Sequence, residues 1–366
     1  MSSRRRILVL NNYSLARVAE EVQGRLKPDH HLFGVNRLSA AGFTVRVVPF
    51  KKFGLLRLIN RVLTLIRFPV AIGDLDQQFS AWLSRNDIDL LYSPCQTQTQ
   101  LLSYLRGLGL FEAPIVTIAH HPIDSGRLRR FRRFFLRWQI RGTDAFPSLS
   151  SKVARQLDEL ANHPGYSPVM QWGPDLDYYP RATGAGSIAI AAGRTARDFV
   201  TFGRAATLSG TRAKVICLAQ DRLPEFAEFG QNVEVQTAAD ERAVNYQELC
   251  AEFAAARVLA VPLCPGETLA GLTSMTDALG VGRPVIMTRH PLIDLDIENE
   301  GIGKWVDHGD INGWADALKW FEENPEKACE MGRRARDIAE TRWNSTKFAE
   351  QLIAIIDGCL VEVHQA

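Results

Sequence analysis

A loop between an apolar run and a helical pattern carries residue types that hold a phosphate group. The run at 258–261 is typical of a buried strand, and residues 273–279 have the apolar spacing of a helix. Free amide groups and the positive end of the dipole at the start of a helix attract anions. We therefore expect Gly271, Leu272 and Thr273 to bind a phosphate, although a plain strand-loop-helix connection capped by Thr273 gives the same local pattern.

Two arginines follow a second apolar run, at 188–191, and offer permanent positive charge. Arg194 comes directly after Ala192-Gly193, and Arg197 follows three residues later. Guanidinium groups bridge phosphate oxygens through paired hydrogen bonds, so the two arginines are candidates for binding an anion. The alternative is an ordinary pair of surface arginines.

A pair of histidines follows a strand in the first half of the chain. Residues 115–118 form an apolar run, and His120 and His121 come just after it. Ligands of open α/β sheets bind at the carboxyl ends of the strands, so one of these rings could contact a substrate there. A lone histidine is more often structural, and the spacing does not say which of the two would face a cleft.

The order of apolar runs and helical patterns predicts the fold. Short runs recur where buried strands are expected and alternate with helical patterns, which is typical of parallel sheets with helices on both faces. One helix is expected over 31–41, where Leu32, Val35 and Leu38 have helical spacing. The runs fall into two groups, at 6–10, 44–48, 88–92 and 115–118, and then at 188–191, 214–217, 233–235, 258–261 and 284–287.

A stretch rich in proline and glycine, at 172–187, separates the two groups. The predicted fold class is therefore α/β, with two doubly wound Rossmann-like domains. We place the first domain at 1–182 and the second at 183–344. A helix over about 345–366 is expected to pack back on the first domain.

Length and composition indicate an ordinary globular chain, with 366 residues, 46% hydrophobic and 23% charged. No apolar run is long enough to span a bilayer, and the run after Arg6 is too short for a signal peptide, so we expect a cytoplasmic protein. The six cysteines lack metal-ligand spacing, and three Asp-Leu-Asp triplets are too common a pattern to indicate a metal site. No P-loop and no dinucleotide fingerprint follows a strand, which argues against triphosphate hydrolysis and nicotinamide binding.

The two halves of the chain differ in charge. Residues 1–180 hold 24 Lys and Arg against 14 Asp and Glu, whereas residues 181–366 hold 19 against 27. A basic half and an acidic half suggest that the two domains face different partners.

Two basic amphipathic segments, 51–68 and 126–141, lie in the basic half. Both are typical of helices that bind an anionic membrane surface; the alternative is that each apolar face packs on the protein. No nucleic-acid-binding motif accompanies these arginines and aromatic residues, so nucleic acid is not an expected partner. The apolar faces consist of Leu55, Ile59, Val62 and Ile66 in the first segment and of Leu128, Phe131, Phe135 and Trp138 in the second.

Taken in order, these elements resemble GT-B glycosyltransferases of the family-four, or group 1, type. The resemblance rests on Ala192-Gly193-Arg194 after a strand, on the loop and helix that follow residue 262, and on Asp277-Ala-Leu-Gly-Val-Gly-Arg-Pro-Val-Ile. It covers most of 187–356 and, more weakly, 5–180. It implies a GT-B fold, in which the two domains face each other across a cleft and the C-terminal domain binds a nucleotide-diphosphate sugar.

The resemblance also implies roles in the C-terminal domain. Arg194 and Arg197 would clamp the diphosphate without a metal, with Arg197 in place of the family's usual lysine. By the same resemblance Arg194 would belong to the catalytic residues, because its positive charge stabilises the departing diphosphate. Asp277 matches the second of two family glutamates and would bind the ribose. The first of these glutamates falls on Leu269, so Glu267, two residues earlier, is the catalytic-site candidate that would reach the sugar.

In the N-terminal domain the resemblance favours His120 over His121. His120 stands three residues after Thr117, as in the family's strand pattern. By this resemblance His120 would contact the donor sugar and belong to the catalytic residues.

The expected function is transfer of a sugar from a nucleotide-diphosphate sugar, with a UDP-sugar favoured as co-substrate and no cofactor. The resemblance implies retention of the anomeric configuration, and the basic segments suggest a lipid-linked or membrane-associated glycan as acceptor, in surface polysaccharide or glycolipid synthesis. The protein would be peripheral at the inner face of the cell membrane. The missing glutamate at Leu269 motivates the alternative, a non-catalytic GT-B-like subunit or scaffold that docks on a membrane or on an active transferase.

Overall fold

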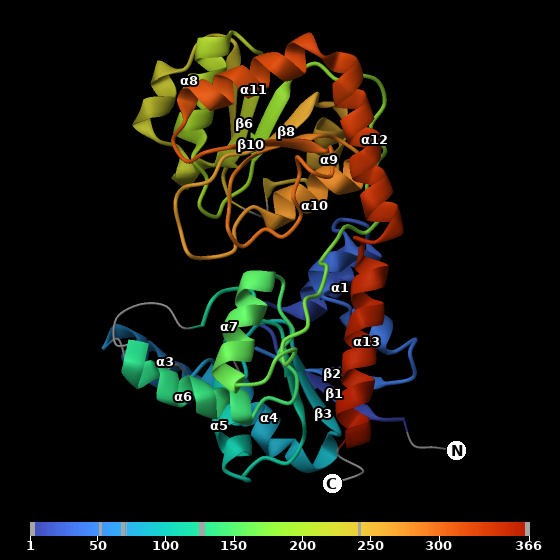
Figure 1. The fold of residues 1–366 in the computed structure, drawn as a ribbon. Coiled ribbons are helices and arrows are strands. Elements are labelled where there is room, and N and C mark those ends of the chain that lie inside the picture. Colours follow the sequence, from blue (N-terminus) through green and yellow to red (C-terminus); the bar gives the residue numbers. More distant parts are fainter. Residues whose placement is uncertain are drawn as a thin grey trace. The chain divides into compact units, whose positions relative to one another are not determined.

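The structure, a computed structural model, describes residues 4–50, 53–66, 70, 72–123, 129–240 and 243–362. The chain divides into two units. Unit 1 comprises Met1–Gln23, His31–Gln171 and Thr346–Ala366, and unit 2 comprises Gly24–His30 and Trp172–Ser345. Each unit is built from a parallel sheet and helices (Figure 1), as the alternation of apolar runs predicts.

Unit 1 contains a four-stranded parallel sheet with strand order β2-β1-β3-β4. Central strands are buried on both faces, which explains why β3 consists of apolar residues and one serine with every position buried. The edge strand β2 is half-exposed, and its sequence alternates accordingly. The strands are β1 (Arg6–Val9), β2 (Thr44–Val47), β3 (Leu90–Ser93) and β4 (Ile115–Thr117).

Helices α4 and α5 cover one face of this sheet, where Ala81, Leu102 and Phe111 join the apolar side chains of the strands. The last helix, α13, belongs to unit 1 beyond its first residue, and the ring of Phe348 lies 6.2 Å from that of Phe33. The helices of unit 1 are α1 (Leu15–Gln23), α2 (Val35–Leu38), α3 (Gly54–Leu65), α4 (Leu75–Leu83), α5 (Gln100–Gly107), α6 (Arg129–Arg141), α7 (Ser151–Ala161) and α13 (Ser345–Glu362), with the 3-10 turn Arg85–Asp87.

Unit 2 contains a six-stranded parallel sheet with strand order β10-β9-β8-β5-β6-β7. The chain starts in the middle at β5, winds outward through β6 and β7, and then crosses back to β8 beside β5. This is the doubly wound order, whose reversal point between β5 and β8 is where such sheets bind ligands. The strands are β5 (Ala189–Ala192), β6 (Ala213–Leu218), β7 (Val233–Ala238), β8 (Val258–Val261), β9 (Val285–Thr288) and β10 (Gly303–Val306).

Successive residues of the unit 2 strands point into two different cores. Ile190 joins the core that includes Met275 of α10, whereas its neighbour Ala191 joins the core that includes Phe202 of α8 and Trp314 of α11. Helices therefore cover both faces, as Figure 1 shows. They are α8 (Phe199–Ser209), α9 (Tyr246–Ala255), α10 (Leu272–Val281), α11 (Ile311–Glu323) and α12 (Pro325–Thr341), with the 3-10 turns Ala219–Asp221 and Pro224–Glu228.

The boundary of unit 2 lies earlier than the predicted division at residue 182. Trp172 is buried and its carbonyl accepts a hydrogen bond from Trp343 Nε1 at 2.8 Å, and Tyr179 is part of the core beside α10. The stretch that reads as a linker is thus part of unit 2, because its aromatic side chains need a core. The prolines and glycines around these aromatic residues predict a turn or linker, so the sequence pattern does not indicate that the stretch packs in the core of unit 2.

Residues 24–30 also belong to unit 2, which the sequence pattern does not predict. Trp172 Nε1 donates to the carbonyl of His30 at 3.0 Å, and the hydroxyl of Tyr178 donates to the carbonyl of Leu26 at 3.0 Å. The segment from Asp29 to Leu32 is a 3-10 turn. Main-chain carbonyls supply these contacts, so no side-chain pattern marks the segment.

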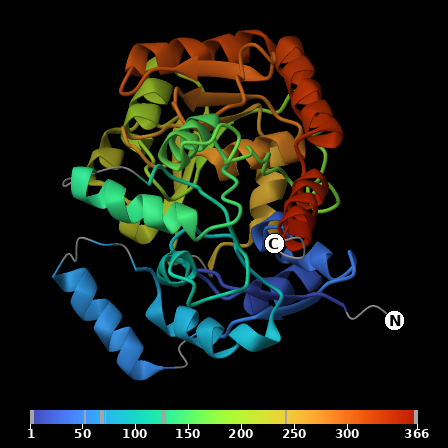
Figure 2. The same cartoon turned by 60° about the horizontal axis from the view of Figure 1, so that its bottom comes forward.

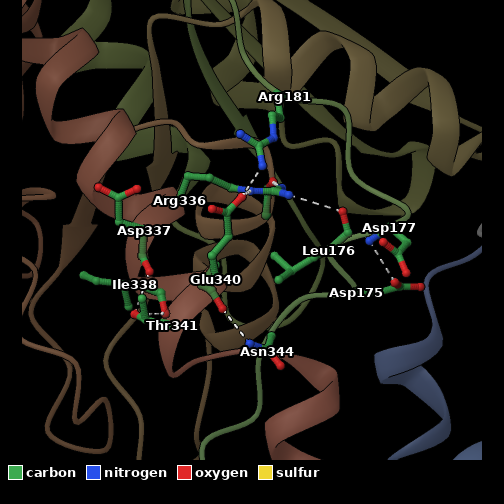
Figure 3. Close-up of polar contacts among 12 residues, drawn as sticks. Asp175, Leu176, Asp177, Arg181, Arg336, Asp337, Ile338, Glu340, Thr341 and Asn344 are labelled. Carbon is green, nitrogen blue, oxygen red and sulfur yellow. Dashed lines mark hydrogen bonds and ion pairs between the residues drawn. The ribbon is translucent and has the colours of Figure 1, made fainter.

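A cluster of charged side chains fixes the start of unit 2 to α12 (Figure 3). Glu340 accepts hydrogen bonds from Arg336 at 2.8 Å and from Arg181 at 2.5 Å. Arg336 also donates to the carbonyls of Gly280 and Leu176. The arginines lower the pKa of the Glu340 carboxyl, mainly through the hydrogen bond from Arg336.

Replacement of Trp314 tests the packing of unit 2. Its fully buried ring packs edge-on against Phe202, with ring centroids 5.9 Å apart. We expect Trp314→Ala to lower the free energy of unfolding of unit 2 by about 3 to 5 kcal/mol, because a large cavity remains. Denaturant unfolding followed by far-ultraviolet circular dichroism measures this loss. Trp320→Ala, on the same helix at a half-buried position, is the control; equal losses for the two variants would contradict the assigned packing.

Candidate functional site

Two loops of unit 2 are held together by backbone hydrogen bonds at the reversal point of the sheet. One follows β5 and the other follows β8. The amide of Asp198 donates to the carbonyl of Pro262 at 3.1 Å, and the amide of Cys264 donates to the carbonyl of Ala196 at 2.9 Å. The two segments that the sequence singles out for diphosphate binding therefore lie side by side at the carboxyl ends of neighbouring strands.

Arg197 lies across the first of these loops and reaches the first turn of α10. Its guanidinium donates to the carbonyls of Ala192 at 3.3 Å and Thr195 at 2.7 Å, and to Ser274 Oγ at 2.8 Å. Gly193 makes this path possible, because it has a φ of 132° and a Cβ there would lie 2.5 Å from Arg197 Nε. Burial lowers the pKa of Arg197 to about 10, so the side chain still carries its charge at pH 7.

Helix α10 begins at Leu272, with Gly271 rather than Thr273 as its N-cap residue. Gly271 has a φ of 83°, and a Cβ there would lie 2.5 Å from Met287 Cε. Among the described residues no side chain caps this helix end, so its first amide groups are not satisfied by a capping residue. The structure thus differs from the interpretation in which Thr273 caps a plain connection, and Thr273 itself is exposed.

Asp277 lies one turn further along α10 and is buried. The hydroxyls of Tyr179 and Tyr246 both donate to its Oδ1, at 2.6 and 2.5 Å. Burial raises the pKa of Asp277 to about 6, against the opposite effect of these hydroxyls and of Arg197. Within the described residues no hydrogen bond engages Oδ2, which leaves one carboxylate oxygen to accept a further donor.

The two tyrosines are site residues that sequence reasoning misses. Tyr179 lies in the stretch that reads as a linker, and Tyr246 is the first residue of α9. Their hydroxyls lie 3.2 Å from each other. Neither position has a motif around it, and only the packing of α9 and of the stretch around Tyr179 against α10 brings them to Asp277.

The other candidates of this unit, Arg194 and Glu267, are exposed on the two joined loops. Both are placed on the loops where the sequence predicts them. Arg197 donates a hydrogen bond to Ser274 Oγ, whereas among the described residues neither arginine donates one to Glu267. Leu269, at the position of the first family glutamate, is half-buried.

His120 lies in unit 1, after β4, and is half-buried. Its Nε2 lies 2.6 Å from the carbonyl oxygen of Pro94, and its ring packs edge-on against Phe33. A carbonyl only accepts, so Nε2 carries the proton and Nδ1 is the acceptor of the ring. Burial lowers the pKa of His120 to about 4, so the ring is neutral at pH 7.

Gln96 holds the backbone of both histidines. Its Oε1 accepts from the amides of His120 at 2.6 Å and His121 at 3.1 Å. Burial also lowers the pKa of His121. The backbone of the loop that carries both histidines is therefore held in place by a single side chain of unit 1.

The aspartate triplets have structural tasks. Asp74 caps α4 by accepting from the amide of Gln77, and Asp175 accepts from the amide of Asp29. Asp296 accepts from Trp305 Nε1 at 3.0 Å. Over the described part of the chain, no group of three or more His, Cys, Asp or Glu side chains is arranged to hold a metal ion.

No protein-family model matches the chain, and no curated protein matches it by sequence. Solved structures match along nearly its whole length. HepE of Anabaena in complex with UDP is 14% identical with a TM-score of 0.66 and covers 96% of this chain and 100% of its own. Sucrose-phosphate synthase from Thermosynechococcus elongatus is 14% identical with a TM-score of 0.70, covering 98% and 100%.

WaaG, a glycosyltransferase involved in lipopolysaccharide biosynthesis, is 13% identical with a TM-score of 0.59, covering 96% of this chain and 100% of its own. The likeness shows that the chain has the GT-B fold, as the sequence predicts.

The unusual pKa of Asp277 predicts how stability depends on pH. A carboxyl with a higher pKa in the folded than in the unfolded chain binds its proton more tightly when folded, so its contribution to stability is lost as pH rises. For Asp277 the loss falls between pH 4 and 6, at no more than about 1.4 kcal/mol per pH unit.

The measurement is denaturant unfolding of the wild type and of Asp277→Asn from pH 4 to 8. The difference between the two proteins isolates Asp277 from all other carboxyls. We expect the free energy of unfolding of the wild type to fall relative to the variant up to pH 6 and to run parallel above it. Parallel curves over the whole range would contradict the raised pKa.

Proposed function

We propose that the chain is a glycosyltransferase that moves a sugar from a nucleotide-diphosphate sugar to an acceptor. The observation that carries this proposal is the Arg197 guanidinium bonded to Ser274 in the uncapped first turn of α10, at the reversal point of the sheet. Positive charge and unsatisfied amide groups meet there, which is what a diphosphate requires. HepE, which shares the fold, is described in complexes with UDP and with UDP-glucose.

The residues of unit 2 divide the work of donor binding. The amides of Leu272 and Thr273 and the guanidinium of Arg197 hold the diphosphate, and Arg194 adds charge from the exposed side of the loop. Asp277 accepts a ribose hydroxyl through Oδ2, since the tyrosines occupy Oδ1. The same positive groups stabilise the nucleoside diphosphate as it departs, so the reaction needs no metal.

The finer points of the proposal concern the sugar. The donor is a UDP-sugar, and transfer proceeds with retention of configuration. Glu267 reaches the sugar from the loop before α10. His120 contacts the sugar through Nδ1, because Nε2 already donates to Pro94.

The proposed acceptor is a lipid-linked or membrane-associated glycan in surface polysaccharide or glycolipid synthesis. The segments 51–68 and 126–141 support this proposal, because both are basic and amphipathic. The chain would work at the inner face of the cell membrane as a peripheral protein. Among the helices of the described residues, none is both long enough and apolar enough to cross a bilayer.

Substitution of the arginines tests the donor site. We expect Arg194→Ala and Arg197→Lys each to lower the rate of nucleoside diphosphate release from a sugar nucleotide by about 10²-fold, because a positioned charge is lost or its planar fork is removed. Release is measured over a panel of sugar nucleotides. Arg212→Ala, at an exposed arginine of the same unit, should leave the rate unchanged.

Circular dichroism confirms that the variants are folded. A folded Arg194→Ala protein with undiminished turnover would overturn the role of this side chain. Calorimetric titration with uridine, guanosine and adenosine diphosphates separates the enzyme from a non-catalytic scaffold, which should bind none of them.

A further inference from the structure

Helix α3 of unit 1 has an apolar face that none of the described residues buries. None of its residues from Gly54 to Leu65 is buried, although seven of the twelve are leucine, isoleucine or valine. Leu65 is 83% exposed and Leu55 is 70% exposed. The other exposed apolar side chains at this helix are Leu58, Ile59, Val62 and Ile66.

The apolar side chains of α3 cover a wider arc of the helix than the side that packs against the rest of unit 1. The half-buried Leu56 and Leu63 mark the side that contacts the rest of unit 1, where α3 packs beside α4. Leu58, Val62 and Leu65 follow an i, i+4, i+7 pattern on the exposed side. A surface helix of a globular protein normally matches its apolar stripe to the core it covers, so the extra stripe indicates a second apolar contact.

Helix α6 is different, because it is anchored in unit 1. Its Leu136, Gln139 and Ile140 are buried, which leaves the exposed Phe134 and Trp138, with ring centroids 6.0 Å apart, at the surface. Both helices lie on the same flank of unit 1, at the left in Figures 1 and 2. Leu128 of the predicted apolar face lies outside the described residues, as do Lys51, Lys52, Arg67 and Phe68.

Charge identifies the occupant of this surface. The segments 51–68 and 126–141 hold five and seven Lys and Arg, and neither contains an Asp or Glu. A second copy of the chain would bring the same positive charge to the contact, and a nucleic acid would not need six exposed aliphatic side chains. An anionic lipid surface satisfies both the charge and the apolar face.

We propose that α3 inserts its exposed apolar face into the interface of an anionic membrane, with Phe134 and Trp138 of α6 as a second contact on the same surface. Arg57 and Arg61 remain at the level of the lipid phosphates. This proposal rests on the membrane association in the proposed function and assigns it to one helix. It is independent of the donor site, which lies in unit 2.

Vesicle flotation tests the proposal with the full chain at low salt. The wild type should float with vesicles of phosphatidylcholine and phosphatidylglycerol and not with phosphatidylcholine alone. We expect Leu58→Gln, Val62→Gln and Leu65→Gln together to weaken this binding at least about tenfold, because the inserted apolar area is lost. Arg57→Gln with Arg61→Gln should weaken it only toward anionic vesicles and reduce its dependence on salt.

The matched control is a triple variant with the same type of change at exposed leucines of unit 2, Leu26→Gln, Leu208→Gln and Leu223→Gln. It should float like the wild type. Equal flotation of the α3 variant and the wild type, or binding to an oligonucleotide in place of vesicles, would overturn the proposal. Calorimetry with UDP on the same proteins keeps the outcomes apart, since loss of vesicle binding with intact UDP binding leaves the donor site unaffected.

Discussion

The hydrogen bond from Arg197 to Ser274 is the contact on which the site depends. A guanidinium must lose much of its hydration to lie across the loop after β5, and burial lowers its pKa to about 10 as a result. Three acceptors, the carbonyls of Ala192 and Thr195 and the hydroxyl of Ser274, compensate for that loss. The result is a fixed positive charge at the start of a helix whose dipole has the same sign at that end.

The Arg197 guanidinium and the positive end of the α10 dipole repel each other in the protein without a ligand. A bound anion would offset this repulsion. Asp277 is the nearby carboxylate in the chain, but two tyrosines share its Oδ1 and its pKa is raised to about 6. At pH 7 Asp277 is still mostly ionised and offsets one positive charge, while the start of α10 and the exposed Arg194 add further positive charge beside it. A diphosphate between the arginines and the helix start fits this imbalance, and this is the physical basis of the proposed donor site.

Nine of the ten strands of the described residues could be predicted from the sequence, because buried parallel strands are short apolar runs between turns. The edge strand β10 is not predicted, because its two central residues, Lys304 and Trp305, are half-buried and do not form an apolar run. The helix expected over 31–41 is wrong in part. Phe33 and Gly34 adopt positive φ values of 48° and 77°, so the segment forms the 3-10 turn Asp29–Leu32 and the single turn of α2. Leu32 and Val35 are both buried, but their apolar spacing does not come from one continuous helix.

The candidate site could be predicted only where the residues lie close in sequence to a strand end. Arg197 and Gly271 are candidates of this kind, because each lies on a loop that follows a strand. Tyr179 and Tyr246 could not be, because only tertiary packing brings them to Asp277. For α3 the sequence predicts an amphipathic helix, and the structure shows that none of its residues from Gly54 to Leu65 is buried.

A crystal structure of the full chain with bound UDP tests the central claim most directly. The account predicts that the diphosphate lies within hydrogen-bond distance of the amides of Leu272 and Thr273 and of the Arg197 guanidinium, with a ribose hydroxyl on Asp277 Oδ2. A diphosphate bound elsewhere on the chain, or Arg197 still bonded only to its present partners beside an occupied site, would contradict it.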